Sequence, residues 1–154
     1  MKIVKRIVAA VVVSAMALSL AACGGSKAKK ISAEDFQAKL EKENFTVMET
    51  PSSDEQITKT LLGYNEDMSV MVTYSLYGNK DDAKKAFEDF KEGAEEAKKS
   101  GEIEKLSTSS SKITASGDGQ CVIVVYAEDM IVMATSLSGD NEDGAKDAIK
   151  ALGV

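Results

Sequence analysis

The stretch YNEDMSVMVT at residues 64–73 returns as YAEDMIVMAT at residues 126–135, with seven of the ten positions identical. Each copy reads as the end of one strand, an acidic turn and a return strand in which residues facing one side alternate with residues facing the other. Convergence on a common hairpin pattern is the alternative explanation. Convergence would require the same type of residue at each position, such as apolar or acidic, but not the same amino acid. The agreement in exact amino acids therefore favours internal duplication.

A helical pattern follows each copy, so the duplicated unit is a ββα block. The two blocks span about residues 57–100 and 119–153. Neither block can bury its apolar strand face alone. Two blocks side by side therefore predict an α+β fold, a two-layer sandwich with a mostly antiparallel sheet and helices on one face. Residues 121–126 and 130–137 are apolar on both faces, which is typical of central strands or of strands covered on both sides.

Ahead of these blocks, Ser32 is expected to cap a further helix that carries apolar residues at helical spacing. This helix would supply cover for the first block. The residues from 32 to 154 then form a single domain, because about 130 residues are the size of one ordinary domain.

The chain begins with a pattern typical of an export signal. Lys2, Lys5 and Arg6 precede an apolar run over residues 7–20, which is too short for a membrane-spanning helix of about 20 apolar residues. The Leu-Ala-Ala-Cys stretch that closes the run resembles the bacterial lipobox. That resemblance implies cleavage before Cys23 and lipidation of its thiol. An ordinary secretory signal is the alternative.

The predicted organisation is thus a signal peptide at 1–22, a lipidated cysteine and flexible tether at 23–31, and the domain. A diacylglyceryl anchor would hold the mature chain on the extracytoplasmic face of the cell membrane, because several acyl chains anchor stably where one is marginal. With Cys23 acylated, Cys121 is the only other cysteine, so no intramolecular disulfide can form. Packing alone must stabilise the domain.

The charge of the chain argues against nucleic acid as a partner. The formal net charge is −6, and removing the three leader cations leaves about −9. Lysines alternate with carboxylates along the predicted helices, whereas binding to a polyanion requires clustered lysine and arginine.

A wider resemblance spans nearly the whole mature chain. Its features are the lipobox, a Ser/Lys spacer, the helix start Ser-Ala-Glu-Asp-Phe, the stretch Asp-Asp-Ala-Lys-Lys-Ala-Phe after the first hairpin, and a terminal Ala-Leu-Gly. In this order they are similar to a loose group of small Firmicutes-type surface lipoproteins. The resemblance implies a Gram-positive cell surface and carries over no catalytic residue.

Few residues suggest catalysis. The sequence has no histidine, which excludes imidazole-activated nucleophiles and the common histidine-based zinc sites. Cys121 heads the run Cys-Val-Ile-Val-Val and is predicted to be buried and unreactive. The acidic turns Glu66-Asp67 and Glu128-Asp129 could act as general acid and base only if their carboxyl groups lay within about 10 Å. We therefore predict no catalytic residue and no enzyme activity.

Asp140, Glu142 and Asp143 form the best metal candidate, because closely spaced acids between Gly139 and Gly144 resemble part of a calcium loop. The spacing departs from such a loop, and no bidentate glutamate follows at the proper distance. The favoured alternative is that Asp140 or Asn141 caps the last helix. No cofactor is predicted.

Tyr64, Met71, Tyr126 and Met133 are candidate binding residues, because methionine and tyrosine on a bare sheet face adapt to apolar partners. Ordinary cross-strand packing is the alternative. The leading prediction is a membrane-anchored, non-enzymatic lipoprotein that binds an envelope protein, a peptide or a small ligand, or assists an envelope assembly. The alternative is a cation-dependent hydrolase or calcium-binding module that uses the acidic turns.

Overall fold

A computed structural model describes residues 28–137 and 143–154, so Cys23, Asp140 and Glu142 lie outside the described residues. The elements follow one another as α2 (Ala33–Lys42), β1 (Thr46–Glu49), β2 (Ile57–Tyr64), β3 (Val70–Tyr77), α3 (Lys80–Lys99), β4 (Lys105–Thr108), β5 (Lys112–Gly117), β6 (Gln120–Ala127), β7 (Met130–Ser136) and α4 (Gly144–Leu152).

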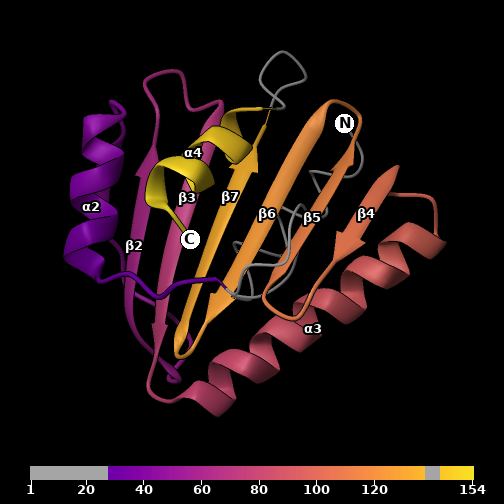
Figure 1. Ribbon diagram of the computed structural model, residues 1–154, viewed down its shortest axis with the longest axis horizontal. Coiled ribbons are helices and arrows are strands. Elements are labelled where there is room, and N and C mark those ends of the chain that lie inside the picture. The colour runs from indigo at the N-terminus through magenta and orange to yellow at the C-terminus, as the bar shows by residue number, and fades with distance from the viewer. Residues whose placement is uncertain (1–27, 138–142) are drawn as a thin grey trace.

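The strands form one sheet in the order β1-β2-β3-β7-β6-β5-β4, and every neighbouring pair is antiparallel (Figure 1). This confirms the predicted α+β class with an antiparallel sheet. The two-sided apolar segments become β6 and β7, and β7 is the central strand. Both strands bury residues toward both faces of the sheet, as their sequence indicates.

The helices cover both faces of the sheet, which corrects the expectation that they share one face. Phe36 of α2 and Ile149 of α4 join a core with Val72, Ile123 and Val132. We call this side the α4 face. The α3 residues, including Phe87, join a separate core that contains the alternate strand residues Ile113, Val124 and Ile131. This opposite side is the α3 face, and the architecture therefore has three layers.

Local signals in the sequence set most element boundaries. The Ser32 hydroxyl accepts a hydrogen bond from the Asp35 backbone N–H at 3.0 Å, so the predicted cap of α2 is confirmed. The Asn79 side chain accepts from the backbone N–H groups of the first turn of α3. Between β5 and β6, Asp118 and Gly119 have φ of 51° and 72°. A two-residue type I′ hairpin turn requires such positive angles at both positions, and the Asp-Gly pair tolerates them.

The register of the two central strands fits the predicted duplication in one respect. Val72 of β3 lies directly opposite Ala134 of β7, and these two residues are equivalent when residues 64–73 are aligned with residues 126–135. An approximate twofold axis normal to the sheet therefore passes between them. The flanking pairs obey the same symmetry, since Val70 lies opposite Ser136 and Tyr74 opposite Val132.

The hairpins do not follow this symmetry further. Tyr64 lies opposite Met71, but the residue opposite Met133 is Val124, not Tyr126. The first turn is longer than the second, which contains only residues 128 and 129, and this shifts the register by two positions. The helices that follow also pack on opposite faces. Internal duplication of the whole ββα block thus remains a prediction.

Within residues 28–137 and 143–154, the helices are all too short or too polar to cross a membrane.

Candidate functional site

The candidate binding site is an apolar stripe on the α3 face of the sheet. It runs across β1, β2, β3 and β7 through Met48, Leu62, Tyr64, Met71 and Met133, which we call the methionine–tyrosine face. The strand register brings these side chains together, because Leu62 lies opposite both Met48 and Thr73, and Thr73 lies opposite Met133. Residues opposite one another in neighbouring strands point to the same side of the sheet.

The structure separates Tyr126 from this group, although all four predicted binding residues point to the α3 face. The Tyr126 ring stacks on Phe87 of α3, with ring centroids 5.3 Å apart and planes inclined by 25°. It belongs to the packed core beneath α3. Met133 lies at the margin of that core, whereas Tyr64 and Met71 lie beyond it. For Tyr126, the predicted alternative of ordinary packing holds.

The methionine–tyrosine face includes one strongly exposed apolar side chain. Met48 is 48% exposed, whereas Leu62, Tyr64, Met71 and Met133 are partly exposed. No helix in the described part of the chain contributes a residue to a core with Leu62, Tyr64 or Met71 on this side. Beside the stripe, the Thr60 hydroxyl is buried without a hydrogen-bond partner among the described residues. The surface therefore offers apolar contact.

An acidic turn borders the Tyr64 end of this face. Glu66 and Asp67 lie in the loop between β2 and β3, next to Met68, which is 60% exposed. Two hydrogen bonds from Ser69, through its side chain and its backbone, hold the pKa of the Asp67 carboxyl below its usual value, so this group is ionised at neutral pH. The rim of the face at this end carries negative charge.

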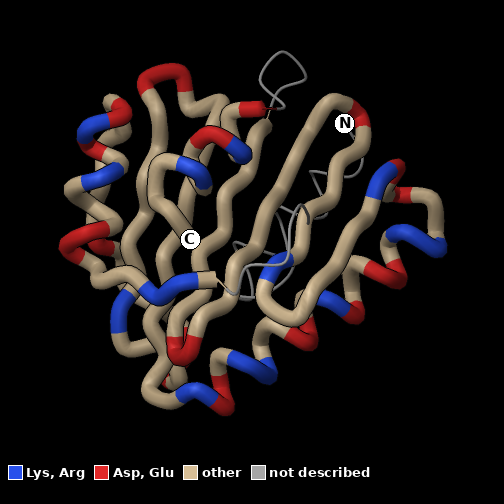
Figure 2. The backbone as a smooth tube through the Cα atoms, viewed as in Figure 1, with Lys and Arg blue, Asp and Glu red and all other residues tan. Residues whose placement is uncertain are grey.

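The two acidic turns lie at opposite ends of the sheet, where Figure 2 shows both in red. The turn with Glu66 precedes β3, whereas the turn with Glu128 precedes β7, and β3 and β7 are antiparallel. Val70, at the start of β3, pairs with Ser136 at the far end of β7. The two carboxylate pairs therefore cannot act together as general acid and base.

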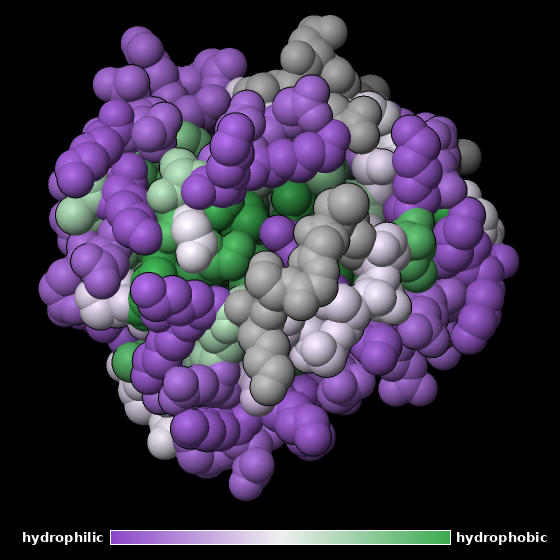
Figure 3. Space-filling view, in the orientation of Figure 1, coloured by the Kyte–Doolittle hydropathy of each residue, from purple (hydrophilic) through white to green (hydrophobic). Residues whose placement is uncertain are grey.

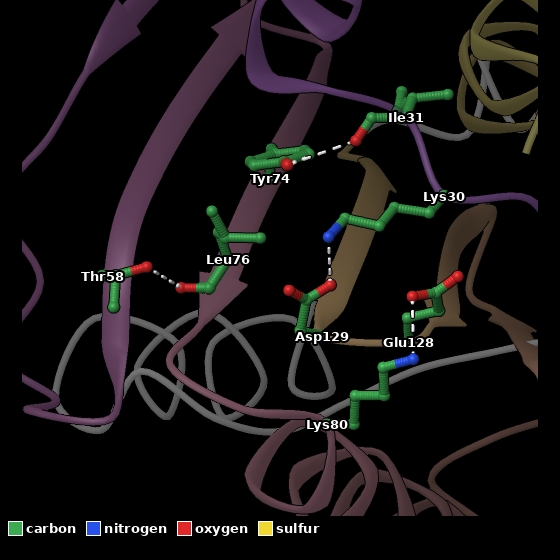
Figure 4. Close-up of polar contacts among 8 residues, drawn as sticks. All are labelled: Lys30, Ile31, Thr58, Tyr74, Leu76, Lys80, Glu128 and Asp129. Atoms are coloured by element: carbon green, nitrogen blue, oxygen red, sulfur yellow. Dashed lines mark hydrogen bonds and ion pairs between the residues drawn. The ribbon is translucent and has the colours of Figure 1, made fainter.

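The second acidic turn is fixed by two lysines (Figure 4). Lys30 contacts the Asp129 carboxylate at 2.5 Å, and Lys80 at the start of α3 contacts Glu128 at 3.0 Å. In the same region, the Tyr74 hydroxyl donates a hydrogen bond to the Ile31 carbonyl at 3.3 Å. Residues 28–31, which we call the strap, are thus attached to the sheet beside this turn.

The metal candidate is only partly described. Asp140 and Glu142 lie outside the described residues. Asp143 is exposed, contacts Lys146 at 2.6 Å and stands at the N-cap of α4 without a side-chain capping bond. Within the described ranges, no group of three or more acidic, cysteine or histidine side chains is arranged to hold a metal ion.

Cys121 is fully buried in the core on the α4 face, as its apolar surroundings predict. Sequence reasoning missed Met48 and Leu62. Leu62 could have been found, because strict alternation within β2 places it on the same side as Tyr64. Met48 could not have been found in this way. Strand β1 has only four residues and a long connection separates it from β2, so the sequence does not indicate which residues of the two strands lie opposite one another.

No protein-family model matches the chain, and no curated protein matches it. Among solved structures, the chain is similar to a GTP-binding regulator from Thermotoga maritima, with a TM-score of 0.45 and 14% identity over 79% of this chain and 84% of that one. It is also similar to the extracellular domain of PknH from Mycobacterium tuberculosis, with a TM-score of 0.43 and 10% identity over 84% of this chain and 98% of that one. Both are distant similarities of fold.

Proposed function

We propose that the chain is a lipid-anchored extracytoplasmic lipoprotein without enzymatic activity, and that its methionine–tyrosine face binds an extended polypeptide segment. The anchoring part is supported by the leader sequence and Cys23. The binding part is supported by one structural observation, the apolar stripe that the described helices leave uncovered. The alternative of a hydrolase that uses both acidic turns lacks support, because those turns lie at opposite ends of the sheet.

The chemistry of the partner follows from the edge of the sheet. Within the part of the chain that the structure describes, strand β1 pairs only with β2, so its outer edge offers backbone groups to an added strand. Met48 on this strand is the most exposed member of the apolar stripe. The ionised Asp67 borders the Tyr64 end. An extended segment that alternates apolar and cationic residues would satisfy all three features.

Binding can be tested with two synthetic peptides, one alternating lysine and valine and one alternating glutamate and valine. We expect the lysine peptide to bind the full chain, and the glutamate peptide to bind far more weakly. Met71→Thr should weaken binding, because threonine suits a strand but removes most of the apolar contact. The matched control is Met68→Thr, which changes an exposed methionine in the turn. Equal binding of the two peptides, or equal loss in the two variants, would contradict the proposal.

Anchoring has a separate test. The intact mass of the chain purified from cell membranes should correspond to cleavage before Cys23 plus a diacylglyceryl group. Cys23→Ser should abolish the added lipid mass and release the chain from the membrane fraction. A wild-type chain that carries no lipid would refute this part of the proposal and leave the peptide-binding part untouched.

A further inference from the structure

A cavity of about 370 Å³ lies on the α4 face, away from the methionine–tyrosine face. Helix α4 packs over β3, β6 and β7, and β5 lies at the margin of this cover. The residues of β5 that point to this side are polar, in contrast to the buried Ile113 and Ala115 on the other side. On the same side of the molecule, apolar surface is visible in a hollow bordered by hydrophilic side chains (Figure 3).

The lining of the cavity combines positive charge with an apolar wall. Lysines come from both sides, Lys112 from β5 and Lys146 and Lys150 from α4, while Ile123 and Ile149 supply apolar contact. Lys146 contacts Asp143. Among the described residues, Lys112 and Lys150 form no ion pair.

Two polar groups in this cavity are poorly satisfied by the protein itself. Lys112 is only partly exposed, and its burial lowers the pKa of the ammonium group because the charged form loses hydration. The Thr114 hydroxyl, two residues further along β5, is buried and has no hydrogen-bond partner within the described structure. Buried polar groups are nearly always paired, so the Thr114 hydroxyl remains able to form a hydrogen bond with a molecule bound in the cavity.

We propose that this cavity binds a small amphiphilic anion, with its carboxylate or phosphate group held by Lys112, Lys150 and Thr114 and its aliphatic part against Ile123 and Ile149. The volume falls within the range of about 300–1,000 Å³ that small-molecule pockets occupy. Two ammonium groups and a hydroxyl supply donors to an anion, and an aliphatic chain would gain from contact with the isoleucines. This binding site is independent of the peptide site proposed above.

The test uses membranes that contain the full chain and two photoreactive probes, a decanoate and a decanol with the same diazirine in the alkyl chain. After illumination, mass spectrometry should locate the decanoate adducts on peptides that contain Ile123 or Ile149. The decanol should label these peptides several-fold less. Unlabelled decanoate and decyl phosphate are added as competitors in separate arms, and the stronger competitor identifies the preferred head group.

Three variants make the test specific. Lys112→Met keeps the apolar stem and should reduce labelling about tenfold, the typical effect of losing a hydrogen bond to a charged group. Thr114→Val preserves shape and should reduce labelling roughly fivefold. Lys105→Met, on exposed β4, is the matched control and should change nothing.

Lys112→Met should also fold normally, since it removes a charge that burial disfavours, and a thermal melt checks this. Equal labelling by the two probes would overturn the proposal. Adducts confined to other peptides, or Lys112→Met labelling as strongly as the wild type, would overturn it as well.

Discussion

Gly63→Ala should destabilise the fold through a single contact. Gly63 lies on β2 under α2, and a Cβ added there would lie 2.7 Å from Cδ1 of Leu40, which is closer than real Cβ atoms approach. Leu40 is fully buried, so its side chain cannot move aside into solvent. Forcing an extra methyl group into a packed core typically costs about 1–3 kcal/mol. The free energy of unfolding, measured by urea denaturation, should fall by this amount relative to a matched glycine.

The matched glycine is Gly78, at the end of β3, where an added Cβ would meet its nearest atoms at 3.8 Å. Both substitutions restrict the unfolded chain equally, by about 0.4–1 kcal/mol, so the difference between them reports the contact with Leu40. Leu40→Val should cost less in the Gly63→Ala background than in the wild type, because it removes the clashing atom. The reasoning is refuted if the two glycine variants are equally stable.

Three further predictions concern buried side chains. Tyr74→Phe removes the hydroxyl that donates to the Ile31 carbonyl, so urea unfolding should show a loss of about 1 kcal/mol; an unchanged midpoint would mean that the strap adds nothing to stability. Burial raises the pKa of Tyr74 from 10.0 to about 12 and also raises that of Tyr77, so stability should be complete below pH 10 and fall as the pH rises toward 12. Thermal melts across this range should show a smaller alkaline loss in Tyr74→Phe, and an identical loss would contradict the assignment. Cys121, which is fully buried, should react with an aromatic disulfide reagent only after denaturation, and rapid reaction in the native chain would refute its burial.

Local sequence signals predicted the hairpins and helices well, because caps and turns act over only a few residues. The Ser32 cap and the two-sided burial of β6 both follow from such patterns. Such local signals do not determine which face of the sheet each helix covers. The apolar stripe of α3 would pack equally well against either side of a sheet, so its placement depends on contacts distant in sequence. Strands β6 and β7 did indicate that both faces of the sheet are covered, because their residues are apolar on both sides.

The binding site was only partly predictable for a related reason. The near-identity of residues 64–73 and 126–135 suggested that Tyr64 and Tyr126 occupy equivalent places. Because the first turn is longer, the strand register of the first hairpin differs from that of the second by two positions. An even shift keeps both tyrosines on the α3 face but changes the residues that lie opposite them. Tyr126 then lies under Phe87, whereas Tyr64 lies beyond the reach of α3. The placement of α3, and not the identity of the repeated residues, gives the two tyrosines different surroundings.

The strap relates the two proposed sites to the proposed anchor. It is attached beside the β6–β7 turn through Lys30 and Asp129, and Ala28 donates its backbone N–H to the Ser111 hydroxyl, next to Lys112. A chain anchored at Cys23 would therefore hold this end of the sheet toward the membrane. The Tyr64 end lies at the opposite end of β3, whose eight residues span roughly 26 Å. The cavity that contains Lys112 would then open near the lipid surface, where amphiphilic anions are concentrated, and the end of the methionine–tyrosine face beside Asp67 would point toward partners in the envelope.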